Sequence, residues 1–466
     1  MSNLLGVVRR PGVARLGGGG LVSEIGDWMM FIALPLFVLQ LTGSPLVTAT
    51  VFALQLVPSV LVGPLAGVLV DRLDPWSLMA GVAAGQAVAL LGLLAVDTDA
   101  QLWLLYLIVG VQAVLSTVIE PCRAVTAAAL VPVEDLATVN QVMGVLSNSA
   151  RLIGGPLGGL ALGLTGIEGV LVAVVALYLL TAATFVIGTR SLRRPGGLHV
   201  DDHATASPAE GSSVSRLGKD WREGMRVVAT TAVLRRVMAV AACTGIAQGA
   251  FIVLFVLFVV RDLHGSETDV GILRGVQAIG AVAGGLLLGV LIRRWSPARL
   301  ASVALAAFGA LSLVVWNAPA LTTELGVYIA LFIAAGVPGM AAMTGLLTLL
   351  QTHTDPGSRG RVLSTFFAVF SGVQAAGMLL AGLVGTGAGL TVALQVQACL
   401  YLLAAALSLR ITTTPPATPA GQRAGRPVLA DRVSSSQRQG ALRGAGPLCE
   451  DAAASTRRAR RKRGRT

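Results

Sequence analysis

Long apolar stretches, separated by short polar segments, run along most of this chain. Each stretch is long enough for a helix that crosses a hydrocarbon core about 30 Å thick, which takes roughly 20 residues. The stretches number about twelve and lie at 21–41, 46–70, 77–96, 102–119, 136–165, 169–189, 233–260, 270–292, 298–316, 325–350, 362–385 and 389–409. This pattern predicts an all-α integral membrane protein with about twelve transmembrane helices in two six-helix repeats.

A polar centre and a polar end divide the chain into four parts. We expect an N-terminal six-helix half at 1–190, a cytoplasmic linker at 191–231, a C-terminal six-helix half at 232–410 and a disordered basic cytoplasmic tail at 411–466. The linker is rich in Pro, Gly, Ser and Asp, a composition typical of flexible segments. The tail has no apolar periodicity, and its final arginine run suits contact with anionic lipid or plain solvation.

The composition excludes several classes of protein. With 54% hydrophobic residues, 12% charged residues and a mean hydropathy of +0.77, the chain is too apolar for a soluble globule. The first stretch contains Glu24 and Asp27 and does not end in a small-residue cleavage site, so we do not expect a signal peptide. The sequence has no Gly-x-x-x-x-Gly-Lys-Ser/Thr phosphate loop and no cluster of metal ligands. We therefore expect a protein that is not an enzyme, with no ATP motor, no cofactor and no metal.

The net charge of +12 would suit nucleic-acid binding, but the distribution of the charge favours a membrane. If the helices alternate in direction, nearly all basic loop residues fall on one side: Arg9, Arg10, Arg15, Arg72, Arg123, Arg190, Arg193, Arg194, Arg216, Lys219, Arg222, Arg226, Arg293, Arg294, Arg299, Arg359, Arg361 and Arg410. The opposite loops carry acids, with Arg261 as their basic residue. Because basic residues concentrate in cytoplasmic loops, both termini are expected inside, with the chain in the plasma membrane. The expected partner is the lipid bilayer and not nucleic acid.

One segment occurs twice, about two hundred residues apart. Gly63-Pro-Leu-Ala-Gly67-Val-Leu-Val-Asp71-Arg72-Leu-Asp74-Pro75 aligns with Gly285-Leu-Leu-Leu-Gly289-Val-Leu-Ile-Arg293-Arg294-Trp-Ser-Pro297. Glycines, arginine and proline recur in register, and the main difference is the exchange of Asp71 for Arg293. A helix end and turn duplicated in two apolar halves predicts a membrane transporter built from two repeats.

These residues carry a family resemblance over roughly 16–410. The segment Gly67-Val-Leu-Val-Asp71-Arg72 resembles the Gly-x-x-x-Asp-Arg signature of the major facilitator superfamily, without its usual trailing basic residues. Gly26-Asp27-Trp28 and Pro121-Cys-Arg123 are similar to the macrolide-efflux-like branch of that superfamily. The resemblance implies alternating access around a central cavity lined by the first, fourth, seventh and tenth helices.

The segment Gly155-Pro156-Leu157-Gly158-Gly159 resembles the Gly-Pro-x-x-Gly-Gly element of drug–proton antiporters, although it is one residue shorter. The same residues also suit a kinked, closely packed helix, because glycine allows helix backbones to approach each other in lipid. Both interpretations stay open.

Charged residues inside the membrane are the strongest candidates for function, since each costs about 2.5–3.5 kcal/mol or more unless it is paired or hydrated. Glu24 and Asp27 are three residues apart and share a face of the first helix, with Phe31 next on that face. Desolvation favours the protonated form of a carboxylate, so Asp27, the deeper of the two, is the first candidate for proton coupling. Alternatively, the two acids form a structural ion pair with Arg151.

Other intramembrane polar residues are candidates for the cavity. Gln112 and Gln248 lie on the fourth and seventh helices, where they either contact substrate or join helices. Arg274 lies near the outer end of the eighth helix, and snorkelling to the surface would explain it.

The exchange of Asp71 for Arg293 predicts a pair of conformational latches. By the symmetry of the expected fold, Asp71, with Gly67 and Arg72 in the same turn, faces Arg361 at the start of the eleventh helix. The charges Arg293 and Arg294 face Glu134 and Asp135 at the start of the fifth helix. The alternative is that these residues only set topology and solvate the loops.

The sequence thus predicts a monomeric secondary transporter that exports amphipathic small molecules or drugs in exchange for protons. The alternatives are an exporter of one metabolite, such as a siderophore or a self-made antibiotic, and a membrane scaffold or sensor that does not transport. Acids on the first helix and an arginine inside the fifth weigh against a scaffold, which has no need of intramembrane charge.

The charge distribution generates a test of topology. In a background with the native cysteines replaced by serine, the Gly197→Cys variant should resist a membrane-impermeant thiol reagent in intact cells, because the linker lies inside. The Asp97→Cys variant is the matched control and should react. Labelling of Gly197→Cys in intact cells would refute the predicted orientation.

Overall fold

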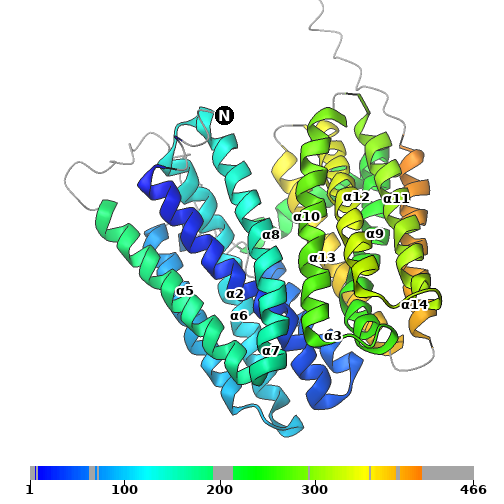
Figure 1. The fold of residues 1–466 in the computed structure, drawn as a ribbon. Coiled ribbons are helices and arrows are strands. Elements are labelled where there is room, and N and C mark those ends of the chain that lie inside the picture. Colours follow the sequence, from blue (N-terminus) through cyan, green and yellow to red (C-terminus); the bar gives the residue numbers. More distant parts are fainter. Residues whose placement is uncertain are drawn as a thin grey trace, which may run out of the picture. The chain divides into compact units, whose positions relative to one another are not determined.

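The computed structural model describes residues 6, 9–61, 69–70, 73–192, 214–291, 294–355, 358–384 and 389–411. These residues belong to one compact unit that spans Met1–Thr413. Its regular elements are helical, and long helices lie side by side in two bundles (Figure 1).

Among the described residues, the N-terminal bundle contains five long helices and two short ones: α2 (Pro11–Thr42), α3 (Pro45–Leu61), α5 (Pro75–Leu91), η1 (Gly92–Ala95), η2 (Asp99–Gln101), α6 (Leu102–Leu130) and α7 (Val133–Leu192). The C-terminal bundle contains α9 (Ala232–Leu257), η4 (Phe258–Asp262), α10 (Glu267–Leu291), α11 (Pro297–Asn317), η5 (Ala318–Ala320), α12 (Leu325–Thr352), α13 (Arg359–Val384) and α14 (Leu390–Leu409). The helix α8 (Val214–Thr230) precedes the second bundle in the chain.

The predicted membrane fold is confirmed. Within the described residues, ten helical stretches are long and apolar enough to cross a bilayer. The longest, Thr138–Thr189, breaks at Gly166, whose φ of 69° and ψ of −172° interrupt α7, so it supplies two crossings. Adding the shorter apolar helix Pro45–Pro58 gives the twelve predicted spans.

Where the structure describes the duplicated segment, both copies end in the same kind of helix start. Asp74 precedes Pro75 at the start of α5, and its side chain accepts a hydrogen bond of 2.8 Å from the Ser77 backbone N–H. In the second half, Ser296 precedes Pro297 and accepts a bond of 3.3 Å from the Arg299 N–H. Proline is well suited to the first turn of a helix because it lacks an N–H that would be unsatisfied there. The sequence repeat therefore encodes a repeated helix start.

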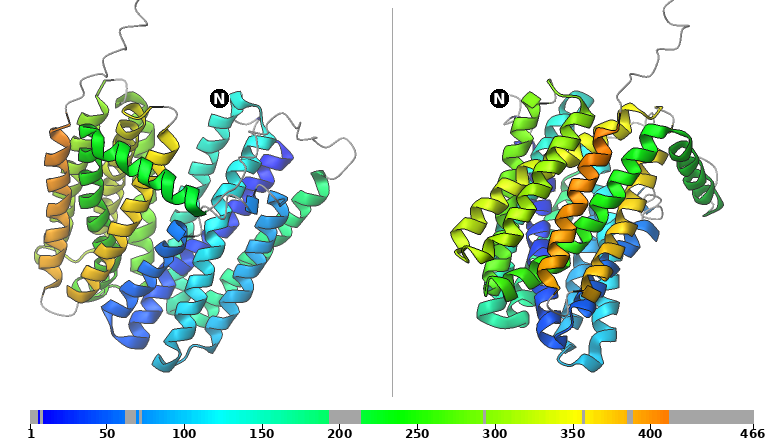
Figure 2. Two further views of the ribbon diagram at one scale, coloured as in Figure 1. Left: turned by 180° about the vertical axis from the view of Figure 1, so that it is seen from behind. Right: turned by 90° about the vertical axis from the view of Figure 1, so that its right-hand side faces the viewer.

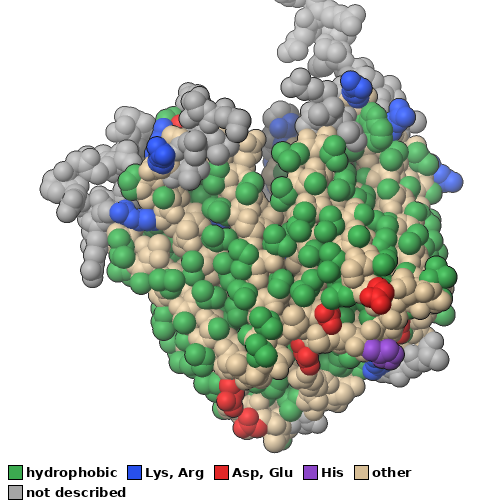
Figure 3. Space-filling view, in the orientation of Figure 1, with side chains coloured by type: hydrophobic (Ala, Val, Ile, Leu, Met, Phe, Trp, Pro, Cys, Tyr) green, Lys and Arg blue, Asp and Glu red, His purple; other side chains and the backbone are tan. Residues whose placement is uncertain are grey.

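Charged loops gather at two ends of the helices. Because successive helices run in opposite directions, the loops and helix termini at one end, here called the basic end, carry Arg10, Arg294, Arg299, Arg359 and Arg410. The loops and helix termini at the other end, the acidic end, carry Asp97, Glu168, Glu267, Asp269 and Glu324. On the face drawn in Figure 3, arginines and lysines lie mainly at one end and acids at the other. This separation matches the pattern on which the topology prediction rests.

The two bundles meet along two helix pairs, α7 with α10 and α3 with α13. Gly155 of α7 lies against Gly271 of α10, and Gly159 lies against the backbone of Glu267. On the neighbouring face of α7, Gly158 lies against Met29 of α2. The Gly-Pro element, with Pro156 beside Gly271 and Gly275, thus lets one helix contact both bundles through backbone atoms.

The segment expected as a linker contains regular structure. Helix α8 occupies 214–230 and is inclined to the helices of the C-terminal bundle (Figure 2). Its Glu223 forms an ion pair with Arg361 at the start of α13, and its Gly224 lies against Thr365. The C-terminal end of the linker is therefore held on α13.

The packing of α7 generates a stability prediction. A methyl group at Gly158 would lie 2.6 Å from the Met29 carbonyl oxygen, a backbone atom that cannot rotate away. The Gly158→Ala variant should therefore lose about 1–3 kcal/mol, the usual cost of overpacking. The readout is a lower apparent unfolding temperature of the purified protein in detergent.

The matched control is Gly144→Ala in the same helix. A methyl group at Gly144 would have no heavy atom within 4 Å, so only the better helix propensity of alanine remains. An equal loss of stability in both variants would show that the approach of α2 and α7 is not what glycine provides.

Candidate functional site

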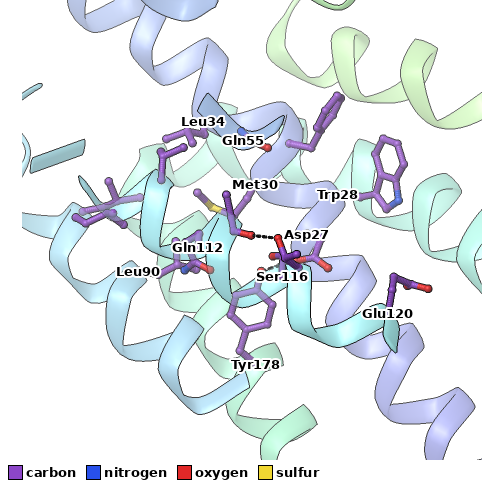
Figure 4. A pocket seen from close by; sticks show the side chains of 16 residues that line it. Asp27, Trp28, Met30, Leu34, Gln55, Leu90, Gln112, Ser116, Glu120 and Tyr178 are labelled. Atoms are coloured by element: carbon purple, nitrogen blue, oxygen red, sulfur yellow. Dashed lines mark hydrogen bonds between the residues drawn. The ribbon is translucent and has the colours of Figure 1, made fainter. Parts of the chain in front are cut away.

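The N-terminal bundle encloses a cavity of about 630 Å³. Its wall comes from α2, α3, α5, η1, α6 and the second part of α7. Most lining side chains are apolar, including Met30, Phe31, Leu34, Leu90, Leu93, Ile108 and Val109. A few polar groups interrupt them: Asp27, Gln55, Gln112, Ser116, Thr117, Glu120 and Tyr178 (Figure 4). A concave apolar wall with few polar groups is the usual form of a small-molecule site.

Asp27 is one of two acids that line this cavity, and the other is Glu120. Its carboxylate accepts a hydrogen bond of 2.5 Å from the hydroxyl of Tyr178, a buried residue on α7. The side chain of Asp27 remains open to the cavity, and no ion pair to it is formed by the described residues. Asp27 thus lies at the wall of a largely apolar cavity.

Glu24 has a different environment, although it lies one turn away on α2. It forms an ion pair with Arg123 of α6, and the two side chains are only 16% and 14% exposed. Arg123 also contacts the exposed Glu120 at 3.2 Å. Arg123 thus supplies a fixed charge partner for Glu24, and this contact joins α2 to α6.

A second cavity of about 280 Å³ adjoins the first. Asp27, Trp28, Ser116 and Glu120 line both cavities, and the second also contains Glu24 and Arg123. A chain of ionisable and polar groups therefore leads from exposed Glu120 to Asp27.

The predicted cavity residues separate into two groups. Phe31 and Gln112 lie on the wall with Asp27, and the Gln112 amide donates a 2.8 Å hydrogen bond to the backbone carbonyl of Gln86. Gln248 lies in the C-terminal bundle, where its oxygen accepts a 3.0 Å hydrogen bond from Tyr401. Gln248 thus joins α9 to α14.

Two expectations about arginines are wrong. Arg151 is not the partner of the two acids, because Glu24 binds Arg123 and Asp27 binds Tyr178. Arg151 instead donates hydrogen bonds across to α10, to Gln277 and to the carbonyl oxygen of Arg274. Arg274 does not snorkel to the surface, since it is only 6% exposed.

The role of Arg123 escaped the sequence analysis because the fourth helix was expected to end at 119. The structure continues α6 through Pro121 to Leu130, so Arg123 lies within the helix instead of in a loop. Proline is tolerated inside membrane helices when neighbouring groups satisfy the freed carbonyl. The signal that could have revealed the Glu24–Arg123 pair was the spacing of Glu120 and Arg123, three residues apart in an apolar context.

The predicted latch falls largely outside the described residues. Gly67, Asp71, Arg72 and Arg293 are not described, nor is the side chain of Glu134. Of the other members, Arg361 binds Glu223, Asp135 forms a 3.0 Å ion pair with Arg10, and Arg294 is exposed. The contacts of Arg361 and Asp135 lie within single bundles or with α8, and the latch stays a prediction.

Comparisons with known proteins agree with this architecture. Residues 13–437 match the family described as Transmembrane secretion effector, of the MFS type. The chain is 28% identical over 151 residues to the uncharacterized MFS-type transporter YfiS of Bacillus subtilis, a match that covers 32% of this chain and 36% of that protein. It is 26% identical over 383 residues to the uncharacterized MFS-type transporter y4rN of Sinorhizobium fredii, covering 81% of this chain and 89% of the relative.

A solved structure shares the fold. It is a bacterial homologue of the iron transporter ferroportin in an inward-facing state, with a TM-score of 0.67 at 16% identity, covering 86% of this chain and 98% of that one. Family and fold together indicate a transport protein rather than an enzyme. The chain belongs to the transmembrane secretion effector family of major facilitator transporters.

Proposed function

We propose that this protein is a secondary transporter that exports amphipathic small molecules in exchange for protons, with Asp27 as the residue at which proton and substrate compete. The observation that supports this most is the contrast between its two intramembrane acids. Glu24 is neutralised by Arg123, whereas Asp27, among the residues that the structure describes, is partnered by the neutral hydroxyl of Tyr178 and opens into an apolar cavity. A carboxylate in that position is favourable only if it binds protons or substrate during the cycle.

The contacts between the bundles support an inward-facing state, with the basic end toward the cytoplasm. Gln40 at the end of α2 donates a 2.9 Å hydrogen bond to Glu267 at the start of α10. Gly382 of α13 lies against Leu46 and Ala49 of α3. Both contacts lie at the acidic end, so they close the side that we assign to the exterior.

The cycle follows from these assignments. In the inward-facing state, ionised Asp27 and the apolar wall bind a substrate from the cytoplasm or from the inner leaflet. The bundles then rock about the α7–α10 and α3–α13 contacts until the cavity opens outside. There a proton replaces the substrate on Asp27, and its release to the cytoplasm resets the site.

Asp27→Asn provides the direct test of coupling. The amide keeps the size of the side chain but cannot exchange a proton, so accumulation driven by a pH gradient in proteoliposomes should fall to the level without a gradient. Downhill movement of the same substrate should persist, because the apolar wall is intact. Gradient-driven transport at the wild-type rate by Asp27→Asn would refute the role of this residue.

Glu24 should respond differently. Removing one member of a buried ion pair leaves the other charge without a partner, which costs up to about 3–5 kcal/mol. Glu24→Gln should therefore lower the apparent unfolding temperature, and Glu24→Gln/Arg123→Gln, which removes both charges, should recover much of the loss. Failure of the double variant to recover would show that the pair is not a structural unit.

A further inference from the structure

Two arginines lie in the middle of the contact between the bundles, outside the Asp27 cavity. Arg151 comes from α7 of the N-terminal bundle and Arg274 from α10 of the C-terminal bundle. Arg274 is only 6% exposed, and Arg151 is partly buried. The mechanism proposed above uses neither of them.

The two guanidinium groups converge on one neutral oxygen. Arg274 Nη1 donates a 3.3 Å hydrogen bond to Gln277 Oε1, and Arg151 Nη2 donates to the same atom. Arg151 Nε also donates to the carbonyl oxygen of Arg274 at 3.3 Å. Two positive charges are therefore held close together around a single amide oxygen.

Aromatic rings and not carboxylates surround this pair. The Arg151 guanidinium lies 5.0 Å from the ring centre of Trp28, and Arg274 lies 5.5 Å from Phe31 and 5.0 Å from Phe251. Neither arginine forms an ion pair with an acid among the residues that the structure describes. Cation–π contacts stabilise the two charges but do not neutralise them.

This arrangement is unfavourable without an anion. Charged groups in the membrane interior pair with one another or mark a substrate pathway, and two like charges at close range repel each other. Apolar side chains could fill the same space at lower cost, as replacement of buried charges in other proteins shows. The oxygen of Gln277 marks the point where both guanidiniums can donate to a carboxylate, sulfonate or phosphate oxygen.

The pair is adjacent to the proposed substrate cavity. Trp28 and Phe31, whose rings contact the arginines, also line the cavity that contains Asp27. One wall of the cavity therefore carries the carboxylate of Asp27, and Arg151 and Arg274 lie behind another wall. None of the three forms an ion pair with another described residue. A group bound between Arg151 and Arg274 would touch both bundles, as expected for a site used in alternating access.

We propose that Arg151 and Arg274 bind an anionic group of the substrate, whose apolar body lies against Trp28 and Phe31. Because ionised Asp27 repels a simple anion and attracts a cation, the substrate class that satisfies both walls is an amphipathic zwitterion. This inference rests on the proposed function in one respect: the bound molecule is taken to be the transported substrate. The binding site itself can be tested without transport.

A set of four fluorescent probes separates the two walls. Nα-dansyl-lysine is a zwitterion, and its carboxamide is a cation. Its Nε-acetyl form is an anion, and the Nε-acetyl carboxamide is neutral. Dansyl fluorescence gives the four dissociation constants for the purified protein in detergent, and all probes share one apolar body.

The wild-type protein should bind each carboxylate probe about tenfold or more tightly than its carboxamide, the ratio for one charge-assisted hydrogen bond. Arg274→Met and, separately, Arg151→Met should reduce that ratio to about twofold or less while leaving the preference for ammonium over acetyl. Arg274→Lys should retain part of the carboxylate preference, because lysine keeps the positive charge but lacks the planar guanidinium that donates two parallel hydrogen bonds.

The matched control is Arg299→Met, which removes an arginine that stacks on Trp295 at 5.1 Å but lies at the basic end. It should leave all four constants unchanged. Apparent unfolding temperatures show whether each variant folds, and the two methionine variants test the pair independently if one of them does not. A carboxylate preference unchanged in both methionine variants would overturn the proposal.

Two additions distinguish other sources of the anion. If sulfate displaces the charged probes and the neutral probe equally well, the site binds a small inorganic ion. That result would overturn the substrate assignment. Competition by phosphatidylglycerol but not phosphatidylcholine would assign the site to a lipid headgroup, with the same consequence.

Loss of the ammonium preference in Asp27→Asn, with the carboxylate preference intact, supports two separate walls. If the ammonium preference survives in Asp27→Asn, the proposed role of Asp27 fails while the arginine site stands.

Discussion

The first part of α7 is packed through its backbone against α2 on one face and α10 on another, and the functional geometry depends on this contact. Gly158 lies against Met29 of α2, while Gly155 lies against Gly271 of α10. Side chains at these positions would push the helices apart. Because the contact is so close, Arg151, one turn before Gly155, reaches Gln277 of the other bundle. The same contact places Trp28, the neighbour of Asp27, beside Arg151.

The charges inside the bundles differ in how they are compensated. Glu24 and Arg123 form an ion pair that joins α2 to α6. Asp27 has a neutral partner in Tyr178, and Arg151 and Arg274 share the neutral oxygen of Gln277. In the membrane interior an isolated charge is costly. A charge with an opposite charge beside it needs no further ligand, whereas a charge without such a partner indicates a functional site. The structure therefore directs attention to Asp27 and to the two arginines rather than to the acid pair as a whole.

The connection between the halves has a consequence for movement. Helix α8 is attached to α13 through Glu223 and Arg361, so the chain between the bundles is partly fixed to one of them. The glycine contacts of α7 with α10 and of α3 with α13 bring backbone atoms of the two bundles together, while Arg151 crosses from α7 to Gln277 of α10. A proposed rocking of the bundles would therefore have to preserve or replace the hydrogen bonds of Arg151.

The sequence by itself determined the number of helices, their repeat and the separation of charge between two ends. These features follow from local composition: the bilayer sets the length of each apolar stretch, and Pro75 and Pro297 mark equivalent helix starts. The sequence also singled out Asp27 and Glu24, because acids in an apolar helix are visible without coordinates. Only the tertiary structure decided the partners. It extended α6 past Pro121 to bring Arg123 to Glu24, and it placed Arg151 on α10 instead of beside the acids. A helix periodicity tells which residues share a face, but the neighbour of that face comes from a segment about one hundred residues away, and packing alone selects it.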